Sequence, residues 1–471
     1  MKVLVVLYYW PPSGGPGVQR GLQLCRHLRE EGIEPVVVTA PHGTWDGPGE
    51  YAADPSLAAV VPPDLRVLRT GPLRGGAMRR LVARSHLHAL AATAFPSALF
   101  ERQAGWRDPL AETLVEAVDD EDPDAVLTSS QPYVVHIAGR AAKLATHVPW
   151  VADFRDPWTQ AWGRTWPSSR VLAWEELREE EVLADADAVV ANTPGCRAQL
   201  LERRPWLDPR RVAVVPNGYD PEDFGEAAPA DASTFRVVHS GSFRARAPDE
   251  ASRPRSGLRA WIDRRRPSPV PYDLSTHSPE TLFRAAAALG GRIGDRALRI
   301  RLVGTVDPRW LGRAAALGVR DAVETPGYLP HRRAVAEVLG AELLFLPTIT
   351  RTDGGAVANV PAKTYEYLGS GRPLAALAGR GDVRDLLGGT DRPRCRVLAP
   401  DDAEGLASLL RDAADGALPA AEPDPPDARP WRRRETARRM AEVLRRVVTR
   451  KSGAPPDGMP TIAPRVDAGA S

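Results

Sequence analysis

The sequence predicts an α/β protein with two domains, each built from a parallel sheet that helices cover. The chain has 471 residues, which is more than a single hydrophobic core usually organises. Short apolar runs alternate with longer segments of helical periodicity, the pattern of parallel sheets packed between helices. An apolar fraction of 43% supplies material for two cores of this kind.

The first domain is expected over residues 1–218. Its apolar runs predict strands at Val3–Leu7, Pro35–Thr39, Ala125–Thr128, Trp150–Asp153, Ala188–Ala191 and Val212–Val215. The segments between them predict helices that include Val18–Glu31, Pro109–Val118 and Leu172–Leu183. The alternation of the two patterns is what favours a parallel sheet over an antiparallel one.

A turn signal, PNGYD at residues 216–220, and a polar alanine-rich stretch mark the end of this domain. We expect a linker over residues 219–234 and a hinge within Pro216–Asp231, where few contacts should cross. Gly218 is expected to permit backbone angles in the hinge that other residues resist. A second crossing between the domains is expected just before Trp431.

The second domain is expected over residues 235–428. Its predicted strands are Arg236–His239, Ile300–Val303, Leu343–Leu346 and Pro373–Leu377, with helices near 279–289, 331–339 and 361–369. Arg244–Ser275, rich in Arg, Pro and Ser, is expected to be an insertion. An amphipathic helix is expected over residues 429–450 and a disordered tail over residues 451–471, which has no periodic apolar face.

Composition excludes several classes of protein. The formal net charge of +2 argues against a dedicated nucleic-acid binder. Cys25, Cys196 and Cys395 are far apart, so neither a zinc site nor a disulfide framework is expected, and a reducing cytoplasm fits. Without an apolar run of about 18 residues, no transmembrane helix is predicted. We therefore expect a cytoplasmic protein that is soluble or at most peripheral at the inner face of the membrane.

Two stretches in the first domain carry candidate functional residues. The turn Pro11–Gly17 contains Gly14 and Gly15, which would let backbone N–H groups approach an anion beside a helix N-terminus. Its glycines do not follow the GxGxxG order, so a nicotinamide site is poorly supported. The alternative is a tight turn without a ligand.

The stretch PWVADFRDPW places Asp153, Arg155 and Asp156 at the carboxyl end of a predicted strand, where ligands bind in open α/β sheets. These groups could orient hydroxyls and handle protons. A nearby His136 could act as a base or contact a substrate hydroxyl. The alternatives are an Asp–Arg–Asp ion network that closes the loop and a buried structural histidine.

The most informative stretch is VPAKTYEYLGSGRPLAAL. Lys363 and Glu366 are three positions apart, which places them on one face near the start of a helix. A lysine there is disfavoured by the helix dipole unless an anion shares the site. Phosphate would supply that anion, and the glutamate could accept both hydroxyls of a ribose. The alternative is an exposed ion pair, but the break Gly369–Gly371 and the apolar strand after it favour a site.

These motifs, in this order, resemble the GT-B retaining glycosyltransferases of family 4, in which two Rossmann-like domains face each other across a cleft. The resemblance covers most of Met1–Val448 and includes the HSGS turn at residues 239–242. It implies that the C-terminal helix crosses back to the N-terminal domain. It also implies that Glu366 holds the donor ribose, that Ser240 and Gly241 lie at the donor, and that Lys363 with Arg244 or Arg246 grips the diphosphate.

The sequence departs from the family at two positions. Eight residues before Glu366 the family has a glutamate that touches the donor sugar, and this chain has Ala358. Many relatives carry a histidine beside the sugar where this chain has Arg155.

The resemblance implies transfer of a sugar from a nucleotide-diphosphate sugar to a glycan, lipid-linked or small acceptor, in cell-surface polysaccharide or glycoconjugate synthesis. The donor is a co-substrate, and neither a cofactor nor a metal is expected, because cationic groups would stabilise the departing diphosphate. One alternative is a sugar-nucleotide epimerase of the same fold. Another is a non-catalytic nucleotide-sugar-binding subunit.

A further hypothesis concerns the membrane. The segment Leu73–Trp106 mixes arginines with apolar and aromatic residues. Such a mixture could rest on anionic lipid and receive a lipid-linked acceptor. The alternative is an ordinary pair of helices that covers the first domain.

Overall fold

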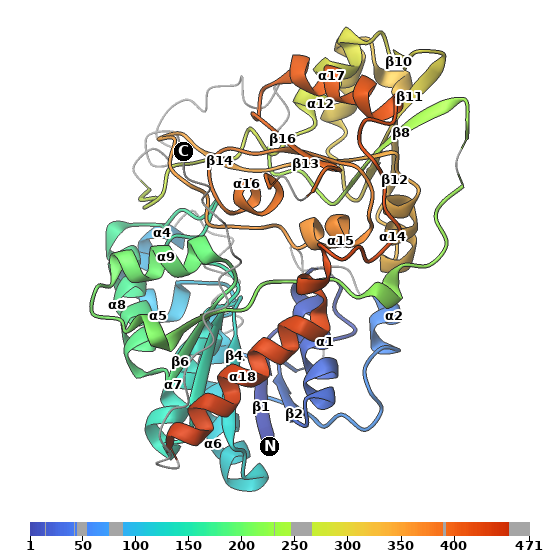
Figure 1. Ribbon diagram of the computed structural model, residues 1–471. Coiled ribbons are helices and arrows are strands. Elements are labelled where there is room, and N and C mark those ends of the chain that lie inside the picture. Colours follow the sequence, from blue (N-terminus) through green and yellow to red (C-terminus); the bar gives the residue numbers. More distant parts are fainter. Residues whose placement is uncertain are drawn as a thin grey trace, which may run out of the picture.

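The computed structural model describes residues 1–14, 16–41, 43–44, 54–74, 88–229, 231–245, 266–389 and 392–451. Figure 1 shows two α/β domains, one above the other, with the chain passing between them twice. Each domain has its own parallel sheet and hydrophobic core. The predicted fold class is confirmed.

The first domain contains, among the described residues, a seven-stranded sheet in the order β3-β2-β1-β4-β5-β6-β7. Neighbouring strands are all parallel. The strands are β1 (Lys2–Leu7), β2 (Glu34–Thr39), β3 (Val67–Arg69), β4 (Ala125–Ser129), β5 (Trp150–Phe154), β6 (Ala188–Ala191) and β7 (Val212–Val214). The helices are α1 (Pro16–Glu30), α2 (Pro55–Ala58), α4 (His88–Ala94), α5 (Pro96–Leu99), α6 (Arg107–Glu121), α7 (Val134–Thr146), α8 (Ser169–Asp185) and α9 (Pro194–Arg203). The strand order reverses between β1 and β4, which puts a ligand crevice at their carboxyl ends.

The second domain has the order β10-β11-β8-β13-β15-β16, with β12 beside β11. Only β10 is antiparallel to its neighbour among the described pairs of this sheet. The strands are β8 (Thr234–Ser240), β10 (Arg292–Ile293), β11 (Arg296–Val303), β12 (Val323–Gly327), β13 (Leu343–Pro347), β15 (Leu374–Leu377) and β16 (Cys395–Leu398). The helices are α12 (Glu280–Ala288), α13 (Arg309–Ala316), α14 (His331–Leu339), α15 (Lys363–Gly369), α16 (Asp382–Leu387) and α17 (Ala403–Ala414).

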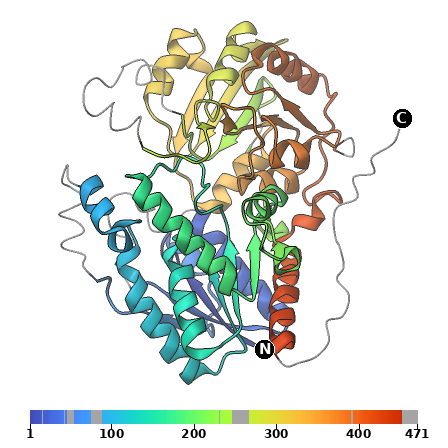
Figure 2. The same cartoon turned by 90° about the vertical axis from the view of Figure 1, so that its left-hand side faces the viewer.

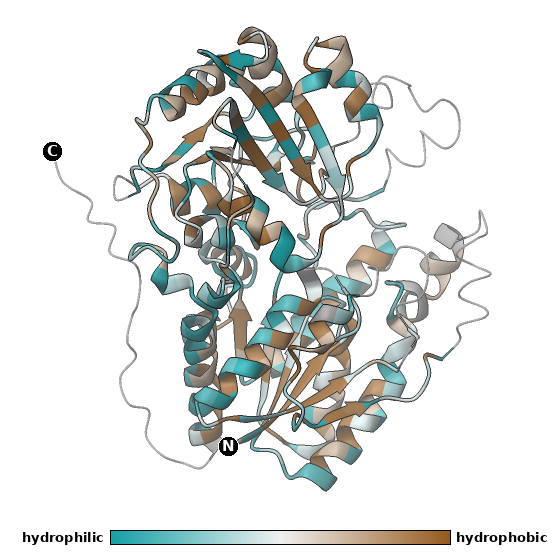
Figure 3. Ribbon diagram, turned by 90° about the vertical axis from the view of Figure 1, so that its right-hand side faces the viewer, coloured by the Kyte–Doolittle hydropathy of each residue, from teal (hydrophilic) through white to brown (hydrophobic). Residues whose placement is uncertain are grey.

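In Figure 3 the strands of the first domain are largely brown, whereas the strands of the second domain that face the viewer alternate brown and teal. Strands that the sequence did not predict, such as β12 and β16, are only partly buried and have no continuous apolar run. The expected insertion lies mostly outside the described residues. Its described end contains β9 (Tyr272–Asp273), which pairs with β14 (Thr350–Arg351).

The last helix, α18 (Arg433–Lys451), returns to the first domain and lies along α1 (Figures 1 and 2). Its apolar face is buried in the core of that domain, through Ala437, Met440, Ala441, Val443, Leu444 and Val447. The crossing of the C-terminal helix, which the family resemblance implied, is therefore confirmed. The expected tail lies outside the described residues, apart from the end of α18.

The two chain crossings between the domains pair with each other. The Tyr219 N–H donates to the Trp431 carbonyl at 3.1 Å, and the Arg433 N–H donates to the Tyr219 carbonyl at 2.8 Å. A Cβ atom on Gly218 would lie 2.4 Å from the Trp431 carbonyl oxygen. Gly218 is not among the glycines with positive φ, so the expectation of special backbone angles there was wrong. Glycine is needed because the crossings approach so closely.

We predict that Gly218→Ala destabilises the protein by about 1–3 kcal/mol, because the added methyl group must push the crossings apart. Thermal unfolding measures this, at roughly 2–4 °C per kcal/mol for domains of this size. Gly225→Ala is the matched control, since a Cβ atom there would meet nothing within 4 Å. Equal melting temperatures for the two variants would show that the crossings tolerate separation.

Candidate functional site

A cleft of about 780 Å³ lies between the two domains. Its lining comes from both sheets at the carboxyl ends of their strands, the place expected for a ligand in folds of this kind. From the first domain it includes Gly17, Arg20, Gln23, Gln131, Arg155, Asp156, Trp162 and Asn217. From the second domain and α18 it includes Ser240, Gly241, Arg244, Gly304, His331, Asn359, Lys363, Glu366, Arg433 and Thr436.

Lys363 begins α15 and is held by a neutral histidine. The His239 Nδ1 lies 2.9 Å from the Phe345 carbonyl oxygen, so it carries the ring proton and Nε2 is left to accept. The Lys363 Nζ lies 3.3 Å from that Nε2. Gly241 has φ of 127°, and a Cβ atom there would lie 2.4 Å from Nζ. The HSGS turn thus leaves room for the ammonium group.

The charge of Lys363 is poorly stabilised in the unliganded protein. Burial, together with the charge of the nearby Arg244 guanidinium, lowers the pKa of Lys363 to about 7. The Arg244 guanidinium carbon lies 4.7 Å from the centre of the Trp162 ring, so this side chain reaches from the second domain to the first. Two cationic side chains therefore converge on one side of the cleft, where an anion would stabilise both.

Glu366 lies one turn after Lys363 and also lines the cleft. The structure thus brings these two predicted residues together on the cleft wall. The Glu366 carboxylate pairs with Arg433 of α18, with 3.7 Å between Oε1 and Nη2.

Arg155 and Asp156 line the opposite wall, as their place after β5 suggested. The Asp156 Oδ1 accepts from the Asn359 amide at 3.1 Å, and Oδ2 accepts from the Gln131 amide at 3.3 Å. Burial raises the pKa of the Asp156 carboxyl, and the Arg155 charge opposes this. The Arg155 Nη1 donates to the Gly17 carbonyl at 3.1 Å. Asp156 therefore links the two domains through Asn359.

Two expected catalytic residues lie behind the cleft, which corrects their assignment as groups that touch substrate. Asp153 is fully buried, and its carboxylate is bound by Arg20 at 2.8 Å and by the Ser129 hydroxyl at 2.7 Å. His136 is fully buried against Phe154, with Nδ1 at 2.8 Å from the Thr128 hydroxyl. Burial lowers the pKa of His136 to about 3, so the ring is neutral.

The remaining predicted site residues do not all line the cleft. Gly14 is buried and does not line the cleft, whereas Gly17 does. Gly15 and Arg246 lie outside the described residues. Ala358 is buried and is not part of the lining, but its neighbour Asn359 is. The polar group that this loop offers to the cleft is therefore an amide.

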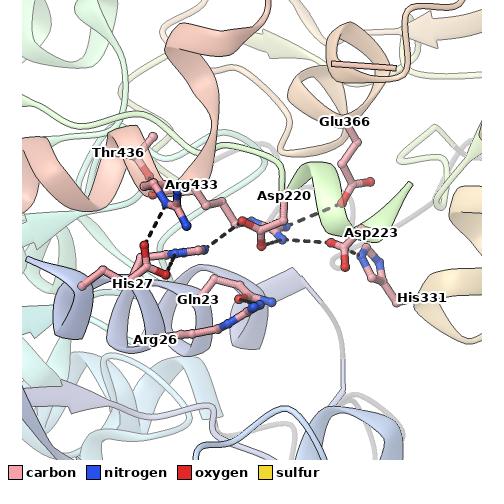
Figure 4. Close-up of polar contacts among 11 residues, drawn as sticks. Gln23, Arg26, His27, Asp220, Asp223, His331, Glu366, Arg433 and Thr436 are labelled. Carbon is pink, nitrogen blue, oxygen red and sulfur yellow. Dashed lines mark hydrogen bonds and ion pairs between the residues drawn. The ribbon is translucent and has the colours of Figure 1, made fainter. Parts of the chain in front are cut away.

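Sequence reasoning missed the cluster shown in Figure 4, where Arg433 lies among Asp220, Asp223 and Glu366. The Arg433 Nη1 lies 2.8 Å from the Asp220 Oδ2 and 3.3 Å from the Asp223 Oδ2. These residues lie on both chain crossings, more than 200 positions apart. No local pattern could have brought them together, although PNGYD marked one of the crossings.

The described residues contain no helix long and apolar enough to cross a membrane, and no group of three or more metal-ligating side chains placed to hold an ion. In the segment of the membrane hypothesis, residues 75–87 are outside the description. Phe100 and Trp106 are buried in the first-domain core, whereas Phe95 is 66% exposed. Two of the aromatic residues assigned to lipid therefore have a structural role instead.

The sequence and the fold were compared with known proteins. Glycosyltransferase Family 4 matches residues 17–223. A D-inositol 3-phosphate glycosyltransferase of Nocardia farcinica is 27% identical over 250 residues, which are 52% of this chain and 44% of that protein. The chain thus spans less than half the length of that relative.

Solved structures match over nearly the whole chain. HepE of Anabaena, in complex with UDP, has a TM-score of 0.52 at 14% identity and covers 96% of this chain and 100% of its own. A putative UDP-N-acetylglucosamine 2-epimerase from Listeria monocytogenes has a TM-score of 0.55 at 13% identity, with 96% and 97% covered. These likenesses show the fold. The chain therefore has the two-domain fold of these proteins, and its first domain is similar to Glycosyltransferase Family 4.

Proposed function

We propose that this protein is a glycosyltransferase that transfers a sugar from a nucleotide-diphosphate sugar to an acceptor. The observation that carries the proposal is the convergence of Lys363 and Arg244 beside Glu366 in the interdomain cleft. Two cations suit a diphosphate, and a carboxylate one helical turn away suits the two hydroxyls of a ribose. The UDP bound to HepE and the activity named for the Nocardia relative both support this reading.

In the proposed mechanism, the second domain binds the donor and the first domain binds the acceptor. Lys363 and Arg244 stabilise the negative charge that develops on the diphosphate as the bond to the sugar breaks, so no metal or other cofactor is part of the proposal. The reaction retains configuration, and the leaving phosphate takes the proton of the acceptor hydroxyl. Asp156 orients hydroxyl groups from the opposite wall, and cleft closure excludes water.

The decisive experiment is a transfer assay. A thermal-shift screen of nucleotide-diphosphate sugars first finds the donor, because a ligand at 100 times its dissociation constant adds about 2.7 kcal/mol of stability. The donor is then incubated with glycan, lipid-linked and small acceptors. We expect a glycosylated product. Epimerised donor without transfer would instead show an epimerase, and tight binding without turnover would show a binding subunit.

We predict that UDP affinity falls as the pH rises from about 7 to 9. Lys363 has a pKa of about 7 without ligand, so it loses its charge over this range, whereas a bound diphosphate favours the ammonium form. The dissociation constant should rise by up to tenfold per pH unit, since one unit of pKa is 1.36 kcal/mol. Isothermal calorimetry in buffers of different ionisation enthalpy would also detect the uptake of a proton.

Lys363→Arg is the control for this measurement, because a guanidinium stays charged throughout. Its affinity for UDP should not change over the same range. Parallel pH profiles for Lys363→Arg and the unaltered protein would mean that Lys363 does not bind the diphosphate.

A separate element of the proposal is a lipid-linked acceptor, used by a protein that works in the cytoplasm at the membrane surface. Phe95 is the exposed aromatic residue on the described part of the expected contact segment. We predict that the protein floats with vesicles containing anionic lipid at low salt, and that Phe95→Ser reduces this binding severalfold. Trp206→Ser, at another residue that is 52% exposed, should have no effect. If the protein does not float with the vesicles at low salt, the proposed membrane contact is wrong.

A further inference from the structure

Arg433 is the first residue of α18 and contacts groups on two sides. Its side chain is buried, and its two terminal nitrogens have different partners. Nη1 faces Asp220 and Asp223 on the first chain crossing, and Nη2 faces Glu366 on α15 (Figure 4). A planar guanidinium can serve both directions at once, which a single ammonium cannot do.

The crossing side of this contact is fixed. The backbone N–H of Arg433 is bound to the Tyr219 carbonyl, and Asp220 is held by His27 of α1, with 2.9 Å between Nε2 and Oδ1. Burial raises the pKa of the Asp220 carboxyl, but hydrogen bonds and charges from His27 and Arg433 outweigh it and lower the pKa to about 2. Asp223 is bound in turn by His331, with 3.0 Å between Oδ2 and Nε2. Arg433 is thus anchored through Asp220 and His27 to α1 of the first domain, and through Asp223 and His331 to α14 of the second.

The Glu366 side of the contact is looser. At 3.7 Å, the pair is an ion pair without a close hydrogen bond. The carboxylate is therefore oriented by charge while its oxygens remain available to accept from other donors. Arg433 and Thr436, one turn later, both line the cleft. Helix α18 thus forms part of the cleft wall and also packs on the first domain.

We propose that Arg433 is a positioning residue for the donor. From helix α18 it orients the Glu366 carboxylate toward the ribose, and it couples donor binding to the closed arrangement of the domains. The inference rests on the proposed function. It adds a residue that no local motif marks and that belongs to neither sheet. Since α18 packs on the first domain and Glu366 belongs to the second, opening the cleft draws the pair apart and releases the carboxylate.

The test compares UDP binding by calorimetry, and the kinetics of transfer, for variants of Arg433, Glu366 and Arg434. We expect Arg433→Gln to raise the dissociation constant for UDP about tenfold, which is 1.4 kcal/mol. Arg433→Lys, which keeps the charge but loses the fork, should raise it about threefold. The KM for the donor should rise in parallel, with kcat at saturating donor within about twofold of the starting value. A purely structural role would lower the fraction of active protein, and so kcat, without changing KM.

A double-mutant cycle connects the effect to Glu366. Glu366→Gln alone should weaken UDP binding, and adding Arg433→Lys to it should cause little further loss, because the two residues act as one unit. Arg434→Gln is the matched control: Arg434 is the next residue of α18, but it pairs with Glu30 on the surface. It should leave UDP binding and KM unchanged.

The outcomes separate the two ideas. If Glu366→Gln weakens UDP binding but both Arg433 variants bind UDP like Arg434→Gln, the coupling is wrong and the donor site stands. If Glu366→Gln has no effect, or if UDP and the other nucleotide diphosphates do not bind, the donor site itself is wrong and the inference falls with it. Should Arg433→Gln not fold, Asp223→Asn replaces it. That variant removes one anchor of Arg433 and leaves Asp220, and a twofold to threefold loss of UDP affinity is expected.

Discussion

The architecture depends on the pairing of the two chain crossings. The chain leaves the first domain after β7, builds the second domain, and returns so that α18 can complete the core of the first domain. The apolar face of α18 is part of that core, so it can be buried only if the chain returns to the first domain. The backbone bonds between Tyr219 and the residues around Arg432 then hold both crossings at one place. This fixes the pivot about which the domains face each other, and so fixes the cleft.

The electrostatics of the cleft follow from this geometry. On the second-domain wall, Lys363 is supported by a neutral histidine, and Arg244 reaches over an aromatic ring of the other domain. Neither contact neutralises the cation. For a diphosphate bound here, the preorganised charges of Lys363 and Arg244 would replace the water that is lost on closure. On the pivot side, by contrast, the Arg433 guanidinium is already paired with the carboxylates of Asp220, Asp223 and Glu366. The cleft thus has an anion-binding wall on one side and, at the pivot, an arginine whose charge is already paired.

A feature could be predicted from the sequence when a short stretch of neighbouring residues encodes it. β1, β13 and the start of α15 were predicted because buried strands read as apolar runs and because Lys363 and Glu366 are neighbours on one helix. The strands β12 and β16 were missed because their residues are half exposed. The roles of Asp153 and His136 were misjudged, since sequence position places a residue at the end of a strand but does not say whether its side chain faces the cleft or Arg20 and Thr128. The contacts of Arg433 were beyond prediction, because they exist only once both crossings meet.

The same contacts indicate how the protein can open. The contacts that join the two domains across the cleft include the Asp156–Asn359 hydrogen bond, the Arg244–Trp162 contact and the hydrogen bond from the Gly195 N–H to Asp382. Others are the hydrogen bonds from the Tyr328 hydroxyl to Asp54, from the Tyr272 hydroxyl to the Gln160 carbonyl and from the Trp166 N–H to the Pro267 carbonyl. Each is a single polar or cation–π contact, worth about 1 kcal/mol. The apolar cores are separate for each domain: α18 completes the core of the first, and Tyr219 of the crossing is buried in the core of the second. Opening therefore breaks individual polar contacts and no apolar core. A donor and an acceptor can enter when the domains rotate apart about the paired crossings, and the bound diphosphate gives Lys363 and Arg244 of the second domain a shared partner.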